Sequence, residues 1–171
     1  ENRLIWRANR KRLTAEAIRD SILSVSGQLS MQQGGPTIRK FSQYDLGYEF
    51  NTIRRSVYVP LFRNTLLELF EVFDLANPNV STGRRSETTL PTQALYMMNS
   101  PFVIAEAKRA GEHIAGLDAP NADRVRLAYR LALGREPTAD EAGLALEFVG
   151  QTEAGAWGAL AHSLFASVDI R

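Results

Sequence analysis

The sequence predicts an all-α fold: a bundle-like body of several helices, interrupted by one long, irregular and polar middle segment. Two observations support the helices: apolar residues recur at spacings of three and four before residue 27 and after residue 90, and residues typical of helix caps stand at the boundaries of these segments. Between residues 34 and 90 the rhythm is lost. A chain of 171 residues is most simply one domain. We therefore expect a single helical domain over residues 1–171, with an irregular insert at about 34–90.

The N-terminal part predicts two helices. The first is short and falls within residues 2–9. The second spans about 14–26, because Thr14 is typical of an N-cap and Gly27 of a C-cap. Its apolar residues share one helical face: Ile18, Ile22 and Val25.

The middle segment begins where Gly34-Gly35-Pro36 breaks the helical pattern. Ser56–Val59 favours one short strand, ended by Pro60, which cannot donate to a β-ladder. A helix is expected over about 64–73, followed by a turn-rich loop at 77–83. Ordered loops of this length are uncommon and often functional, so a site is best sought here.

About five helices follow residue 90. Pro91 suits a first helical turn, and Ser100-Pro101 marks another helix start. A helix opens at residues 121–123 and is closed by Gly134, and Thr138 with Glu141 forms a capping box for the next. The last helix has the clearest amphipathic pattern, given by Trp157, Leu160, Ala161, Leu164, Phe165 and Val168. Short connections predict antiparallel packing of these helices.

Composition excludes several classes of protein. Twenty Lys and Arg against 19 Asp and Glu leave a net charge of +1, which argues against a nucleic-acid binder. No apolar run approaches the roughly 18 residues of a membrane span. The absence of cysteine removes disulfides, thiolate metal sites and the CxxCH haem attachment. The chain opens at Glu1 and its helical pattern still runs at Ile170, so we expect it to be one module of a larger protein.

Several short motifs together carry a family resemblance. They are TAEAIRD at 14–20, RRSVY at 54–58, NPN at 77–79, PTQAL at 91–95, NSPFV at 99–103 and LALGREP at 131–137. In this order, over nearly the whole chain, they resemble the planctomycete-specific C-terminal domain of unknown function. The resemblance implies an exported bacterial protein, periplasmic, cell-surface or extracellular, with a second uncharacterised domain and often a cytochrome-c-like domain. It implies no activity, and haem only in a companion domain, so we expect no cofactor or metal in this chain.

The candidate ligand-binding residues lie mostly in the polar middle. Arginine pairs beside hydroxyl groups and loop N–H groups can bind sulfate, phosphate or carboxylate through parallel hydrogen bonds. The competing interpretation is that these arginines pair with Asp74, Glu87 or loop carbonyls and hold the irregular segment together. The full candidate set is Arg54, Arg55, Tyr58, Asn79, Arg84, Arg85 and Gln93.

Other residue clusters give weaker signals. The aromatic residues Phe41, Tyr44, Tyr48 and Phe50 either anchor the loop on the helices or offer a stacking surface for sugars or a partner, for which Tyr44 or Tyr58 would serve. Carboxylate pairs suited to glycoside hydrolysis need a separation in space that a sequence does not give. His113 and His162 show no metal-ligand spacing, and no GxSxG elbow is present.

Two functions follow from these observations. The first is a non-catalytic interaction or scaffolding module that docks on companion domains of an exported multidomain protein. The alternative is binding or hydrolysis of an acidic or sulfated polysaccharide at an Arg-rich polar pocket. Whether the chain is an enzyme is left open, since no catalytic signature is present in it.

Overall fold

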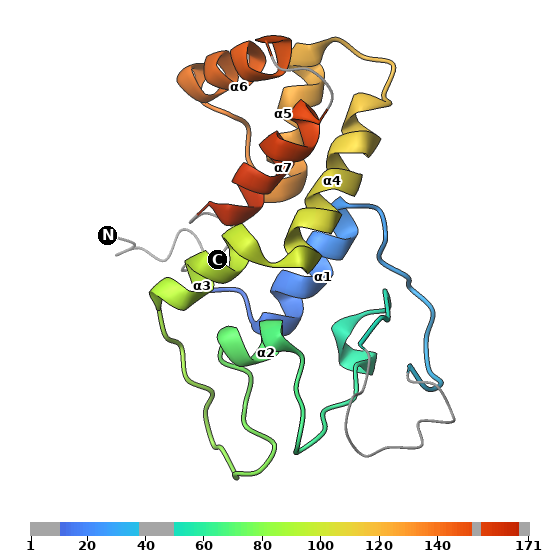
Figure 1. The fold of residues 1–171 in the computed structure, drawn as a ribbon, viewed down its shortest axis with the longest axis vertical. Coiled ribbons are helices and arrows are strands. Elements are labelled where there is room, and N and C mark those ends of the chain that lie inside the picture. Colours follow the sequence, from blue (N-terminus) through green and yellow to red (C-terminus); the bar gives the residue numbers. More distant parts are fainter. Residues whose placement is uncertain (1–10, 38–49, 152–154, 168–171) are drawn as a thin grey trace, which may run out of the picture.

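The computed structural model describes residues 11–37, 50–151 and 155–167. Within them the chain forms seven α-helices, one short 3₁₀-helix and no strand, which confirms the all-α prediction (Figure 1). The helices are α1 (Ala15–Val25), η1 (Ser56–Tyr58, 3₁₀), α2 (Glu68–Val72), α3 (Pro91–Asn99), α4 (Pro101–Ala115), α5 (Asn121–Leu133), α6 (Ala139–Gln151) and α7 (Ala156–Ala166). The five helices expected after residue 90 are present as α3 to α7.

Helices α4 and α7 lie side by side and join two hydrophobic clusters. The first cluster packs α1, α2 and α3 against one half of the α4–α7 pair, with Phe70, Met97 and Phe165 fully buried. The second packs α5 and α6 against the other half, around Ile114 and Val125. The α4–α7 pair therefore connects the two ends of the molecule.

Two glycines allow α4 and α7 to approach closely. A Cβ atom built on Gly111 would lie 2.2 Å from the backbone nitrogen of Gly158 and 2.5 Å from its Cα. No side chain larger than hydrogen fits there, because real Cβ atoms do not come within 3.0 Å of other heavy atoms. Ala107 and Ala110 on α4 and Ala161 on α7 are further small, buried residues of the same two helices.

The predicted helix caps are confirmed. Thr14 accepts the Ala17 N–H at the start of α1 (3.3 Å), and Gly27 follows its end at φ +73°. Thr138 and Glu141 form the reciprocal capping box of α6: the Glu141 N–H donates to Thr138 Oγ1 and the Thr138 N–H to Glu141 Oε2. Gly134 ends α5 in the left-handed region at φ +66°.

The strand expected at Ser56–Val59 is wrong: these residues form η1 and its C-terminal cap instead. The N–H of Ser56 donates to the Asp20 carboxylate on α1 (2.8 Å) rather than to a neighbouring strand. Val59 donates back to the Ser56 carbonyl (3.0 Å), which closes a tight turn. The single β-type contact nearby is an isolated parallel bridge between Ser30 and Arg54, among the residues that the structure describes.

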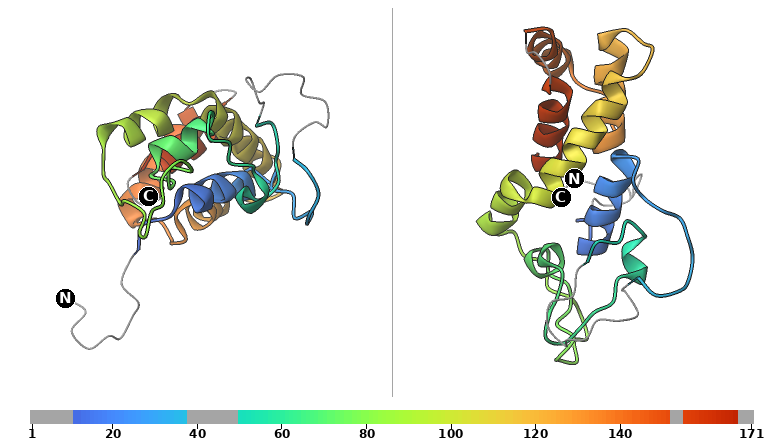
Figure 2. Two further views of the ribbon diagram at one scale, coloured as in Figure 1. Left: turned by 90° about the horizontal axis from the view of Figure 1, so that it is seen from below. Right: turned by 45° about the vertical axis from the view of Figure 1, so that its right-hand side comes forward.

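The helix expected over 64–73 is shorter, because α2 begins at Glu68. The described part of the middle segment lies at the end of the molecule opposite α6. Figure 1 and the right-hand view of Figure 2 both show this arrangement. Val59 and Arg54 are buried, and Phe50 packs against the first hydrophobic cluster, so residues 50–60 lie on the helices.

Some predictions concern residues outside the described ranges. They are the short helix at 2–9 and the aromatic residues Phe41, Tyr44 and Tyr48. In the described part of the chain, no helix has both the length and the apolarity needed to cross a membrane.

Candidate functional site

Arg54 is buried and binds the backbone of a neighbouring loop. Its Nε donates to the Gln32 carbonyl (3.3 Å), Nη1 to the carbonyls of Gly35 (3.3 Å) and Pro36 (3.4 Å), and Nη2 to that of Gly34. Gly34 and Gly35 have φ values of +64° and +78°, a left-handed turn that brings successive carbonyls round the guanidinium. The side chain of Arg54 therefore organises residues 32–36.

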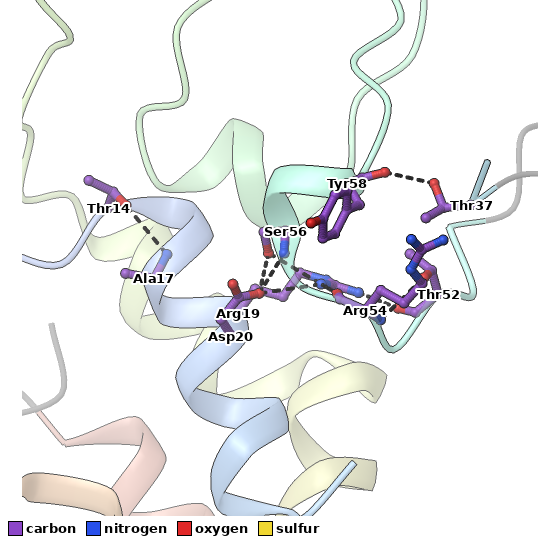
Figure 3. A network of polar contacts seen from close by, with 9 residues as sticks. All are labelled: Thr14, Ala17, Arg19, Asp20, Thr37, Thr52, Arg54, Ser56 and Tyr58. Carbon is purple, nitrogen blue, oxygen red and sulfur yellow. Dashed lines mark hydrogen bonds and ion pairs between the residues drawn. The ribbon is translucent and has the colours of Figure 1, made fainter. Parts of the chain in front are cut away.

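Tyr58 supports this arrangement. Its ring centroid lies 4.9 Å from the guanidinium carbon of Arg54, within the range of a cation–π interaction. The Tyr58 carbonyl accepts a hydrogen bond from Thr37 (2.8 Å). Figure 3 shows the Tyr58 ring above Arg54, so this aromatic face is already covered by a cation from the same chain.

Arg19 joins α1 to the same segment from the other side (Figure 3). Only 3% of its side chain is exposed, and its Nη1 donates to the Arg54 carbonyl (2.9 Å) and to Ser56 Oγ (3.2 Å), while Nη2 donates to the Thr52 carbonyl. Burial lowers the pKa of Arg19, while the carboxylates of Asp20 and Glu106 oppose that change. A buried arginine thus fixes residues 52–56 on α1.

Arg84 and Arg85 line a notch of about 160 Å³ beside the N-terminus of α1, together with Arg12. Arg85 Nη1 donates to both carboxylate oxygens of Glu16, at 2.8 and 2.9 Å. Partial burial raises the pKa of Glu16, but hydrogen bonds from its own backbone and from Arg85 outweigh it and leave that pKa below its ordinary value. Arg84 is exposed and forms no ion pair with the residues that the structure describes.

Gln93 is fully buried and its amide is fully hydrogen-bonded. Nε2 donates to the carbonyls of Val72 (3.0 Å) and Thr88 (3.3 Å), and Oε1 accepts from Leu90 N (3.2 Å) and from Arg12. These four bonds tie the end of α2, the returning loop and the start of α3 together. A ligand would have to displace one of them to reach the Gln93 amide.

Asp74 closes the same loop. It has a left-handed backbone (φ +60°) just after α2, and its carboxylate accepts from the Thr88 N–H (2.7 Å) and the Thr88 hydroxyl (2.8 Å). Asn79, another candidate, donates from its side chain to the Arg63 carbonyl (3.0 Å), while its N–H donates to Asn77 (2.9 Å). Both residues stabilise turns.

The structure thus separates the predicted site residues. Arg54, Tyr58 and the exposed Arg55 belong to the loop against α1, Arg84 and Arg85 to the notch, and Gln93 to the α2–α3 junction. The notch that Arg84 and Arg85 line includes neither Arg54 nor Arg55. Their role in binding a ligand stays a prediction, but the pairing with loop carbonyls that the sequence offered as the other interpretation is observed for Arg54.

Sequence reasoning missed two buried charged residues, Arg19 and Glu106. Glu106 is 4% exposed and accepts from the Ser26 hydroxyl (2.6 Å) and from Arg109. A signal existed in both cases. Arg19 stands beside Ile18 on the apolar stripe of α1, and Glu106 stands beside Ala107 on that of α4, and a charge at a core position is rarely left unpaired.

Metal and histidine chemistry find no support in the described part of the chain. No group of three His, Cys, Asp or Glu side chains there could hold a metal ion. His113 is exposed. His162 Nε2 lies 3.0 Å from the Met97 carbonyl, and because a carbonyl only accepts, this nitrogen carries the proton and links α7 to α3.

The fold and these contacts define a small helical domain whose irregular segment is held on the helices by buried arginines and amides. Residues 1–149 match the model of the family PSD1, described as Protein of unknown function (DUF1553), and the chain belongs to that family. No curated protein and no solved structure is detectably similar to the chain.

Proposed function

We propose that this domain is a non-catalytic interaction module of an exported multidomain bacterial protein, and that it docks on companion domains through the outer face of α3. The family resemblance supports the exported, multidomain setting. The structural support comes from the distribution of apolar side chains, described next.

Helix α3 carries large apolar side chains on its exposed face as well as on its buried one. The buried face contains Met97 and the hydrogen-bonded Gln93, both fully buried. Its outer face carries Leu95 and Met98, which are 56% and 55% exposed, and Leu90, just before the helix, is 49% exposed. Large apolar side chains that gather on an exposed helix face are typical of an interaction surface, so the outer face is suited to a protein partner. This is the observation on which the proposal depends.

The polar segment supports the same function by exclusion. Arg54 and Gln93 are occupied by hydrogen bonds to this chain's own backbone. Such groups hold a scaffold rigid but leave few donors free for a substrate. A rigid body with an uncovered apolar helix fits docking better than catalysis.

A binding experiment tests the proposal. The companion domains are expressed separately, and their affinity for this chain is measured by isothermal titration calorimetry. We expect saturable binding that the double substitution Leu95→Ser and Met98→Ser weakens at least tenfold. The matched control is Leu144→Ser with Phe148→Ser on α6, which removes exposed apolar side chains (69% and 41% exposed) elsewhere and should leave the affinity unchanged.

Two outcomes would contradict the proposal. One is no binding between the wild-type chain and any companion domain. The other is equal affinity of the α3 variant, with an unchanged melting temperature that shows the variant is folded. Light scattering of each sample identifies self-association, which would place a second copy of the chain, not a companion domain, on α3.

The notch at Arg84 supports a second candidate, binding of an acidic or sulfated glycan. Three arginines line it against two carboxylates, Asp74 and Glu87. Arg12 Nη1 is buried there without a hydrogen-bond partner, and its ion pair with Asp74 is long, at 3.9 Å. A thermal-shift titration with chondroitin sulfate, polygalacturonate and neutral maltohexaose tests this candidate. It predicts a salt-sensitive rise in melting temperature with the two acidic glycans, lost in Arg84→Ala and kept in Arg55→Ala. No shift with either acidic glycan would remove the candidate.

A further inference from the structure

A cavity of about 320 Å³ lies between α1, residues 50–53, the start of α2, and helices α3 and α4. Aliphatic side chains form much of its wall, namely those of Leu23, Leu67 and Leu69. Phe50, Phe102 and Tyr96 add three aromatic rings. A dry apolar cavity of roughly 150 Å³ suffices for benzene, so this one has room for two fused rings.

Charged groups converge on the same cavity. Arg19 and Glu106 line it and are 3% and 4% exposed, and Arg109 lines it with its side chain 48% exposed. Glu106 is matched by Arg109, which donates to Oε1, while Ser26 donates to Oε2. Two arginines against one glutamate leave one positive charge in the lining.

Arg19 is the arginine of the lining whose own carboxylate partner, Asp20, stands outside the lining. Its hydrogen bonds go to neutral oxygens, two carbonyls and the Ser56 hydroxyl. Asp20 Oδ1 forms an ion pair with Arg19 Nη1 at 3.7 Å, which is longer than a hydrogen bond, and it accepts a hydrogen bond from Ser56 instead. The hydrogen bonds of Arg19 all come from Nη1 and Nη2, and none of them goes to a carboxylate. A buried guanidinium that donates only to neutral oxygens gains most from a charge-assisted hydrogen bond to an anionic acceptor.

We propose that this cavity binds an aromatic monocarboxylate, with its ring system between Phe50, Tyr96 and Phe102 and its carboxylate near Arg19 and Arg109. Apolar walls with a few convergent polar groups are typical of small-molecule sites, and a planar carboxylate matches the guanidinium fork. A single negative charge balances the lining, whereas a dianion would meet the Glu106 carboxylate. The site is separate from the outer face of α3 and does not depend on the docking role.

The test compares 2-naphthoate with its neutral amide, 2-naphthamide, by NMR titration of the labelled chain. We expect saturable shifts at cavity residues for the acid and at least tenfold weaker binding of the amide. Arg109→Gln should weaken binding of the acid about tenfold and leave the amide unchanged, because it removes one charge at an exposed position. A merely structural role of Arg109 would affect both ligands alike.

Cavity-blocking variants provide the second arm. Ile53 lines the cavity and is 46% exposed, so Ile53→Trp fills its edge without disturbing the core and should abolish binding. Val57 is 70% exposed and does not line the cavity, so Val57→Trp should bind as the wild type does. The proposal is overturned if 2-naphthoate shows no saturable shift, if the amide binds equally well, or if Ile53→Trp binds as tightly as Val57→Trp.

Discussion

The close approach of α4 and α7 at Gly111 makes a sharp prediction: Gly111→Ala should destabilise the protein. An added Cβ would meet Gly158 N at 2.2 Å, Gly158 Cα at 2.5 Å and the Trp157 carbonyl carbon at 2.5 Å. All three are backbone atoms, so no side chain can rotate away. The α4 and α7 helices must instead separate by about 1 Å to reach ordinary contact, which weakens packing along both.

The size of the effect follows from two opposing contributions. Overpacking of a core costs about 1–3 kcal/mol. Here the added Cβ meets backbone atoms of α7, which cannot rotate away, so we expect a cost at or above the upper end of that range. Replacing Gly by Ala within a helix contributes about 1 kcal/mol in the other direction. We expect a net loss of about 2–3 kcal/mol, which for a chain of this size lowers the melting temperature by roughly 4–12 °C.

The assay is urea and thermal unfolding followed by circular dichroism. Gly143→Ala on α6 is the matched control, because its Cβ would meet nothing within 4 Å and the residue is exposed. That control should gain about 0.5–1 kcal/mol from helix propensity alone. If Gly111→Ala is as stable as the wild type, α4 and α7 do not cross as closely as described, and the reasoning fails.

Three further predictions concern buried or paired polar groups. Arg19→Met should lower the free energy of unfolding by about 2–4 kcal/mol because it leaves two carbonyls without their donor, whereas exposed Arg55→Met should change it by less than about 0.5 kcal/mol in the same urea titration. Gln93→Leu keeps the volume but removes four hydrogen bonds, so calorimetry should record a loss of about 2–4 kcal/mol, and an unchanged melting temperature would contradict the role assigned to this amide. Hydrogen bonds from Arg135 and from Thr138 lower the pKa of Glu141 from 4.5 to about 2. Because the folded pKa lies below the unfolded one, the stabilisation is present above pH 4.5 and is lost as the pH falls toward 2, and carboxyl NMR should show Arg135→Ala returning this pKa toward 4.5.

Most helices of this fold could be predicted because their signals are local. An N-cap such as Thr14 satisfies donors within its own first turn, and a C-terminal glycine such as Gly134 supplies a backbone conformation that other residues adopt at a cost. The apolar spacing of α1 and α7 is likewise read within two or three turns. In the middle segment, hydrogen bonds go to partners that are distant in sequence. The prediction of a strand at Ser56–Val59 was wrong for this reason.

The candidate site was harder to predict because its partners are distant in sequence. The sequence offered Arg54 either as a ligand-binding group or as a partner of loop carbonyls, but the carbonyls that surround it, at residues 32–36, stand about twenty positions away. Glu106 bonds to Ser26, 80 residues earlier. The neighbouring sequence does not indicate which residue such a charge will bind. It indicates only that a charged residue stands on an apolar helix face.

The sequence by itself therefore determined the all-α class, the helix boundaries that depend on caps, and the family, since each depends on short-range order along the chain. Tertiary structure decided which polar residues meet. It placed Arg54 against a loop instead of in an open pocket, divided the arginine pairs between two surfaces, and brought Arg19 and Glu106 to one cavity. The physical reason is that a buried charge must find its partner in space, and packing of the helices sets that distance.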